Sequence, residues 1–199
     1  MTNTYLTMER SSGIEYPVSP EIAGRKSTRA YSDRPVDEAH IRSLFEAVRW
    51  APSSTNEQPW MYLYATNDQP EFRAKMNQAI SESNRVWSDK APLLMLALTR
   101  RTFLKNGSVN AHAEYDLGGA NAFLSLQAVH LCMQVRQMAG FSKEVAIREL
   151  NIPDGYEPVV FIAIGYPGDA LSLPEKLQLR ETAPRERYRQ ETFVMNRPF

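Results

Sequence analysis

The sequence predicts a single α+β domain over residues 1–199, and three observations support that prediction. Apolar residues recur at helical spacing in several segments, whereas other segments are short apolar or aromatic runs typical of strands. These two kinds of segment do not alternate regularly, so a doubly wound parallel sheet is not expected. No repeat or Gly/Ser linker divides the chain, and its length suits one domain. Residues 1–24 are expected to form an extended lead-in.

The first half of the chain is expected to contain two helices and two strands. A helix between the N-cap Asp37 and Pro52 has an apolar face of residues at i, i+3, i+4 and i+7, which are Ile41, Leu44, Phe45 and Val48. Residues 60–66 are aromatic-rich and predict a strand. A second helix begins near Pro70. Residues 93–98 are all apolar, which predicts a strand over residues 93–99 that is buried on both faces.

The second half is expected to begin with a long helix over residues 116–138. Its spacing alternates between three and four, and its remaining faces are also small or apolar. Such a helix needs cover nearly all round, which indicates the molecular centre or a subunit interface. Cys132 is expected to be an inert core thiol within it. A short helix capped by Ser142 and a buried strand over residues 159–166 follow, and the tail at 176–199 is basic.

Composition excludes several classes of function. Lys plus Arg and Asp plus Glu are each 23, so the net charge is zero, whereas binders of nucleic acid or anionic membranes usually carry a basic surplus. One cysteine cannot form an intramolecular disulfide or a multi-cysteine metal site. The longest apolar runs are too short to span a membrane, and the polar N-terminus lacks a secretory signal. We therefore expect a cytoplasmic protein without a metal.

Three segments carry possible binding chemistry. Residues 25–29 place two guanidiniums and a hydroxyl on one face of a helical turn, an arrangement suited to a phosphate dianion. Residues 51–60 form a polar loop whose hydroxyls, amide and backbone N–H groups could line a heteroaromatic ring. Residues 185–187 supply another pair of guanidiniums. Each segment alone is equally compatible with a solvated surface or an ordinary loop.

Together, these segments resemble the nitroreductase family of FMN-dependent oxidoreductases. The resemblance rests on R-x-S-x-R at residues 25–29 followed by A-P-S-S-x-N-x-Q-P-W at residues 51–60. Q-M-A-G-F at 137–141, I-A-I-G-Y-P at 162–167 and D-L-G at 116–118 agree with it. It covers nearly the whole chain.

The resemblance implies a three-layer fold, with a mostly antiparallel sheet between helices and a C-terminal tail that extends to the partner subunit. It also implies a homodimer that binds two FMN molecules between its subunits. The residues implied to hold the ribityl phosphate are Arg25, Ser27 and Arg29, with added charge from Arg185 and Arg187.

The flavin ring is implied to have contacts from both subunits. On one subunit, Asn84 contacts the pyrimidine edge, and the N5/O4 edge faces the backbone of Met138, Ala139 and Gly140. The other subunit contributes Pro52, Ser53, Ser54 and Asn56.

Two positions need separate comment. Trp87 stands where the family often has a basic side chain near flavin N1/O2, and a positive charge there favours the anionic reduced flavin. Redox tuning is therefore open unless Arg85 or Lys90 takes over that role. Asp116 matches a position that sometimes lies near the cofactor, but we expect it to be a helix N-cap.

The implied activity is ping-pong two-electron transfer from NAD(P)H, through FMN N5, to nitroaromatics, quinones or activated alkenes. No side-chain base is required, which agrees with the lack of a recognisable nucleophile in the sequence. Two alternatives remain. One is a specialised reduced-flavin enzyme of the same fold, such as a dehalogenase or a flavin-fragmenting enzyme, although no lid is recognisable in residues 100–115. The other is a non-catalytic flavin-binding protein.

Overall fold

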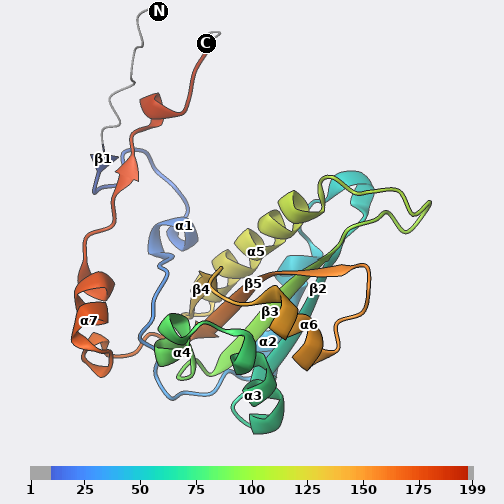
Figure 1. Ribbon diagram of the computed structural model, residues 1–199. Coiled ribbons are helices and arrows are strands. Elements are labelled where there is room, and N and C mark those ends of the chain that lie inside the picture. Colours follow the sequence, from blue (N-terminus) through green and yellow to red (C-terminus); the bar gives the residue numbers. More distant parts are fainter. Residues whose placement is uncertain (1–9, 197–199) are drawn as a thin grey trace, which may run out of the picture.

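A computed structural model describes residues 10–196 and shows three layers (Figure 1). The central layer is a four-stranded sheet made of β2 (Trp60–Thr66), β3 (Leu93–Arg100), β4 (Gln134–Met138) and β5 (Tyr156–Gly165). The spatial order is β2-β3-β5-β4, and every neighbouring pair is antiparallel. The predicted α+β class and antiparallel sheet are therefore confirmed, and the strands expected at residues 60–66, 93–99 and 159–166 are present.

Helices cover both faces of this sheet. On one face lie α2 (Glu38–Arg49) and α5 (Ala113–His130), and on the other lie α3 (Pro70–Ala79), α4 (Glu82–Ser88) and α6 (Lys143–Leu150). β3 is apolar on both sides because its alternate residues enter two separate cores. The α2/α5 core receives Leu93, Met95 and Ala97, and the α3/α4/α6 core receives Leu94, Leu96 and Leu98.

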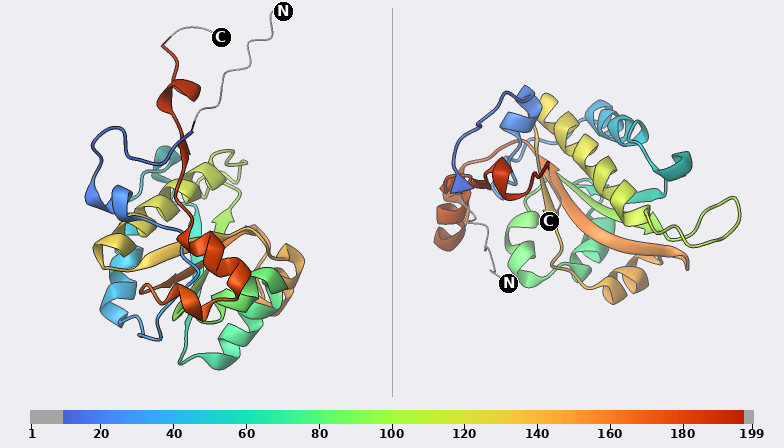
Figure 2. Two further views of the ribbon diagram at one scale, coloured as in Figure 1. Left: turned by 90° about the vertical axis from the view of Figure 1, so that its left-hand side faces the viewer. Right: turned by 90° about the horizontal axis from the view of Figure 1, so that it is seen from above.

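The lead-in and the tail lie side by side. β1 (Arg10–Ser11) pairs with β6 (Arg187–Tyr188), and this two-stranded ribbon projects from the main body (Figure 2). The tail also contains α7 (Glu175–Thr182) and the 3-10 turns η2 (Ala170–Ser172) and η3 (Gln190–Thr192). The expectation of an extended lead-in is wrong at α1 (Pro20–Gly24), because proline at the first helical position favours a helix. Residues 1–9 and 197–199 lie outside the described part.

The expected helix over residues 116–138 is wrong at both ends. α5 begins at Ala113 and stops at His130, and Gln134–Met138 is the edge strand β4. Leu131 and Val135 are four residues apart and so resemble a continued helix in the sequence. β4 is only five residues long, too short for its strand pattern to outweigh that spacing.

A left-handed turn ends α5. Cys132 has φ +60°, its N–H donates to the carbonyl of Val129 at 2.9 Å, and the N–H of Met133 donates to the carbonyl of Ala128 at 2.8 Å. This pair of bonds is a Schellman motif, with the buried side chains of Ala128 and Met133 in the usual apolar positions. Cys132 is exposed, so the expected core thiol is also wrong.

Among residues 10–196, no helix is both long and apolar enough to cross a membrane. The same residues contain no group of three His, Cys, Asp or Glu side chains placed to hold a metal ion.

Candidate functional site

A cavity of about 1100 Å³ lies where the two ends of the chain meet. Its walls come from the segment after α1, the edge strand β4, and α7 with the tail that follows it. All five residues that the resemblance implies for phosphate binding line this cavity: Arg25, Ser27, Arg29, Arg185 and Arg187. The fold therefore brings together arginines that are 160 residues apart in the sequence.

The segment at residues 25–29 is not a helical turn, and that expectation is wrong. α1 stops at Gly24, and Arg25 is extended with φ −64° and ψ 125°. β4 holds the segment in this form: Gln134 accepts from the N–H of Lys26 at 2.7 Å and donates to the carbonyl of Gly24 at 3.2 Å. Alternate residues of an extended chain point to opposite sides, and Thr28 is accordingly buried while Ser27 is exposed.

Positive charge gathers at one side of the cavity. Burial, followed by the nearby Arg187 and Arg185, lowers the pKa of Arg25. Arg185 donates to the backbone carbonyls of Arg25 and Ala23 at 2.6 and 2.8 Å. Within residues 10–196, no carboxylate forms an ion pair with Arg25, Arg185 or Arg187. Crowded guanidiniums without a carboxylate are an arrangement suited to a bound oxyanion.

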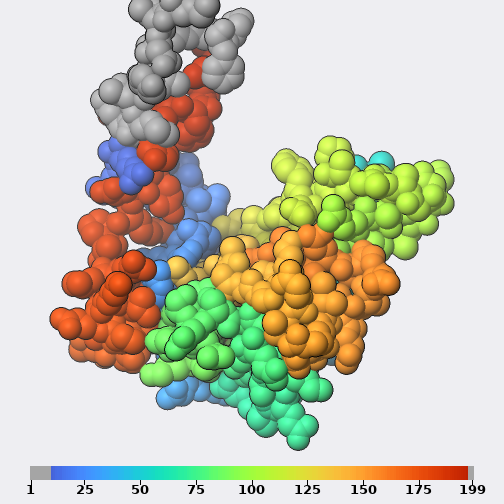
Figure 3. Space-filling model, viewed as in Figure 1, coloured from blue at the N-terminus to red at the C-terminus, as the bar shows by residue number. Residues whose placement is uncertain are grey.

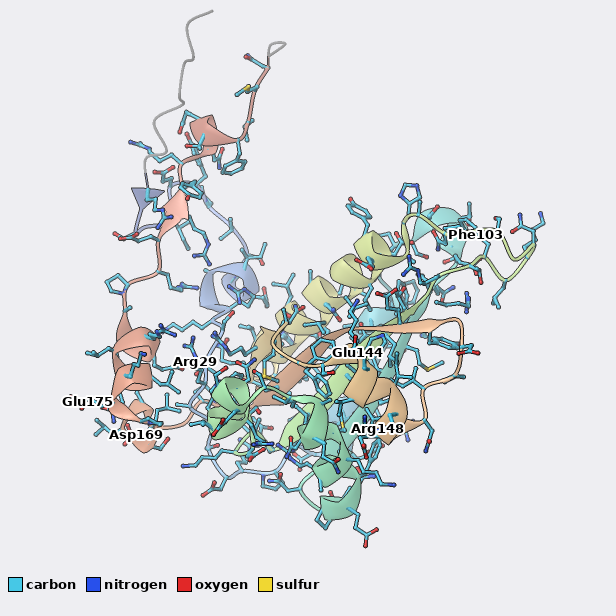
Figure 4. The ribbon with its side chains drawn as sticks, in the orientation of Figure 1. Arg29, Phe103, Glu144, Arg148, Asp169 and Glu175 are labelled. Carbon is cyan, nitrogen blue, oxygen red and sulfur yellow. The ribbon has the colours of Figure 1, made fainter. Side chains whose placement is uncertain are left out.

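Arg29 differs from the other arginines because it already has an acidic partner. Its guanidinium lies 3.6 Å from the carboxylate of Glu181 on α7, and both side chains are nearly buried. Figure 4 shows Arg29 between α7 and the main body. Sequence analysis missed Glu181, since nothing in the local pattern of α7 distinguishes it from its acidic neighbours.

The residues implied for the flavin ring lie farther along β4. The Asn84 side-chain amide donates to the carbonyl of Gly140 at 3.2 Å. A Cβ added at Gly140 would lie 2.7 Å from the Asn84 amide nitrogen, so a larger residue there would displace the Asn84 amide. Ala139 and Gly140 are exposed, whereas the Met138 side chain is buried. Sequence analysis did not predict α4, the short helix that carries Asn84.

β4 lies between the residues implied for the phosphate and those implied for the flavin ring. The strand covers about 13 Å from Gln134 at the cavity to Met138, at 3.3 Å per residue, and Gly140 follows two residues later. A second cavity of about 440 Å³ lies between this strand and α5, and Arg25 and Ser27 line it as well. The open edge of the sheet therefore offers an elongated surface with cations at one end and an amide at the other.

Trp87 does not face this surface. Only 1% of it is exposed, and it belongs to the α3/α4/α6 core. The guanidinium of Arg136, a β4 residue that lines the larger cavity, lies 5.4 Å from the centre of its ring. Lys90 is one of two cations that could replace the basic side chain missing at position 87. It donates instead to the carbonyl of Ser172 at 3.4 Å.

The polar loop lies elsewhere, at the N-terminal end of α5. There the N–H of Ser54, in the 3-10 turn η1 (Ser54–Asn56), donates to the Asp116 carboxylate at 3.0 Å. Asp116 is 4% exposed and lies inside α5, whose N-cap is His112, so the N-cap expectation is wrong. About 20 Å of helix, at 1.5 Å per residue, separates Asp116 from His130 beside α1. Within one chain, none of the four loop residues lines the cavity of about 1100 Å³ or that of about 440 Å³, both of which Arg25 lines: Pro52, Ser53, Ser54 and Asn56.

Comparison with known proteins adds independent information. The sequence model of the nitroreductase family matches residues 22–110. A solved structure described as an oxidoreductase containing FMN is 30% identical, with a TM-score of 0.88 over 94% of this chain and 95% of that one. A nitroreductase family protein from Clostridium difficile 630 is 23% identical and shares the fold, with a TM-score of 0.70 over 90% of this chain and 98% of that one.

Two curated relatives are similar over most of their length. A protein of Archaeoglobus fulgidus is 28% identical over 74% of this chain and 84% of its own. A protein of Streptomyces coelicolor is 24% identical over 71% of this chain and 79% of its own. Both are provisionally named NADH dehydrogenase/NAD(P)H nitroreductase.

Proposed function

This chain belongs to the nitroreductase family of flavin-dependent oxidoreductases, and from that premise we propose that it uses FMN to pass two electrons from NAD(P)H to electron-poor acceptors. Nitroaromatics, quinones and activated alkenes are the acceptor classes proposed. One observation carries the proposal: Arg25, Arg185 and Arg187 converge on a cavity in which no described carboxylate pairs with them. Bound FMN supplies the hydride chemistry, and the protein supplies position, charge and access.

The residues at this surface fit FMN. The cationic end suits a phosphate dianion, and the length of β4 suits a ligand whose phosphate and ring system lie far apart. The Asn84 amide donates to the Gly140 carbonyl, so its oxygen remains directed to other donors, such as the polar edge of a flavin. We assign no side chain a proton-transfer step, and the chain's own contribution is to bind and orient.

We propose that a second copy of the chain completes each site. The sides of α5 that the core does not cover carry exposed apolar and small residues: Tyr115, Gly118, Ala122 and Phe123. A Cβ added at Gly118 would meet nothing within 4 Å, so a neighbouring helix can approach closely. Packing two α5 helices about a twofold axis would carry the loop with Pro52, Ser53, Ser54 and Asn56 to the arginines of the partner.

The tail is proposed to add to the same dimer. Figure 3 shows β6 and the described residues after it, together with β1, projecting beyond the main body. Phe193 and Val194 are 67% and 59% exposed there. Large apolar side chains on a projecting segment are expected to dock on another surface, and we propose the partner subunit as that surface.

Anaerobic stopped-flow mixing tests the proposed activity. The purified yellow protein is mixed with NADH or NADPH, and flavin absorbance is followed. We expect rapid bleaching, and recolouring when menadione or nitrofurazone is added. Absence of bleaching at millimolar pyridine nucleotide would favour a non-catalytic flavin-binding protein. Bleaching that neither acceptor reverses would favour a specialised reduced-flavin enzyme such as a dehalogenase.

A further inference from the structure

Glu181 makes an unusually complete set of contacts for a surface helix. Its two carboxylate oxygens accept from the N–H of Arg29 at 2.9 and 3.0 Å, and one of them also accepts from the Thr28 hydroxyl. The N–H of Ala30 lies 3.5 Å away, and the Arg29 guanidinium completes the set at 3.6 Å. The Glu181 side chain is only 11% exposed. A charged side chain with this many partners fixes the backbone that it contacts.

Glu181 is also the main polar attachment of α7. The helix has no buried residue, and only Leu177 packs partly against the α3/α4/α6 core. Arg185 and Arg187 follow Glu181 by four and six residues. The position of this carboxylate therefore helps to set where the tail arginines lie in the cavity, together with the bonds from Arg185 to the Arg25 and Ala23 carbonyls.

The same carboxylate divides the arginines into two kinds. Arg29 is neutralised by Glu181, whereas Arg25 is crowded by Arg187 and Arg185. An incoming phosphate gains more from cations that have no carboxylate partner than from one that already has such a partner, since that carboxylate would also repel the phosphate.

We propose that Glu181 is a positioning residue that assembles the phosphate site from both ends of the chain. Arg25, Arg185 and Arg187 then take the phosphate, and Arg29 serves to hold Glu181. This inference rests on the proposed FMN function, and it reassigns a role that the resemblance gave to Arg29.

Binding of FMN and riboflavin to the full-length Glu181→Gln protein tests the proposal, because the two ligands share the ring and differ in the phosphate. By equilibrium dialysis we expect the Kd for FMN to rise about tenfold and that for riboflavin to change less than about twofold. Glu175→Gln is the matched control, since Glu175 lies on the outer side of the same helix (Figure 4), and it should change neither Kd. Equal weakening of both ligands by Glu181→Gln would show a merely structural role and overturn the proposal.

Arginine variants provide a second, independent readout. Arg29→Gln removes the guanidinium contact of Glu181 and leaves its backbone contacts, so it should weaken FMN binding less than Glu181→Gln does. The double variant should lose no more than Glu181→Gln alone, because both changes act on the same contact. Arg25→Gln should weaken FMN binding more than Arg29→Gln does. A larger loss from Arg29→Gln, or additive losses in the double variant, would overturn the proposal. If Glu181→Gln does not fold, the comparison of Arg25→Gln with Arg29→Gln decides whether Arg29 takes the phosphate or holds Glu181.

The two proposals can fail separately. A wild-type protein that binds neither FMN nor riboflavin contradicts the proposed function itself. A wild-type protein that prefers FMN, alongside a Glu181→Gln variant with the same preference, contradicts only the role of Glu181.

Discussion

The arginines near the two ends of α5 differ in whether a carboxylate pairs with them. Near its C-terminal end, Arg25, Arg185 and Arg187 gather with no carboxylate of residues 10–196 paired to them. Near its N-terminal end, Arg100 forms a nearly buried ion pair with Glu57 at 2.5 Å. Figure 4 places Arg29 and Phe103, which mark these two regions, at opposite sides of the molecule.

We interpret the first region as a surface that binds a ligand and the second as one that holds the loop containing Ser54. Gathered guanidiniums without a carboxylate are unfavourable until an anion binds, which is why we propose the C-terminal end as the one that binds a ligand. At the N-terminal end, Arg100 is already paired with Glu57, and Asp116 holds the loop by accepting from the N–H of Ser54. On the proposed function, one chain holds two unlike half-sites, and the proposed dimer joins them.

The largest effect is expected from keeping the half-sites of two copies apart. Phe123 is 41% exposed on the open face of α5, and Phe123→Arg places a charge in the proposed interface. We expect a monomer that loses its flavin, measured by light scattering and by absorbance at the flavin band. Ile147→Arg on α6, where the side chain is 42% exposed, is the control and should stay dimeric and yellow. A yellow Phe123→Arg dimer would contradict the proposed interface.

A mixture of two inactive variants tests whether each site is formed by two subunits. Arg25→Gln damages the cationic half-site, and Pro52→Trp places a bulky ring in the loop half-site. Alone, each should be nearly inactive. Random pairing makes half of the dimers mixed, and each mixed dimer keeps one intact site of two, so about a quarter of wild-type activity should return.

A second mixture serves as the control for this experiment. Arg25→Gln mixed with Arg185→Gln should regain nothing, because both changes lie in the same half-site. If the loop and the arginines served one site within a single chain, the first mixture would also remain inactive.

Local patterns were enough to predict most of the sheet and its helices. Residues 60–66 and 93–99 form strands as expected, because burial on one or both faces leaves a direct trace in the order of apolar residues. The end of α5 left no such trace. The left-handed residue is Cys132 rather than glycine, so the usual signal for a helix end is missing.

The site was predictable only where residues that act together are close in sequence or match a family motif. Arg25 and Arg185 were identified through the resemblance, and the structure brings them into one cavity. Glu181 could not be found, because its partners lie about 150 residues away and α7 has another glutamate, Glu175, that the local pattern does not distinguish from it. The extended form of residues 25–29 depends likewise on Gln134 in β4, which no local pattern specifies.

The smallest expected effect is a dependence of stability on pH that arises from Glu57, near the N-terminal end of α5. The N–H of Leu104 and, secondarily, the guanidinium of Arg100 lower the pKa of Glu57 from its ordinary value of 4.5. A carboxyl whose pKa is lower in the folded state stabilises the protein above the unfolded pKa, and that stabilisation is lost as pH falls through the folded pKa. Wild type should therefore have a higher urea midpoint than Glu57→Gln at pH 7, and the gap should narrow as the pH is lowered below about 4.5. Glu71→Gln, on the exposed side of α3, should show no gap at either pH. A gap for Glu57→Gln that persists unchanged in acid would mean that the loop depends on the shape of this side chain rather than on its charge.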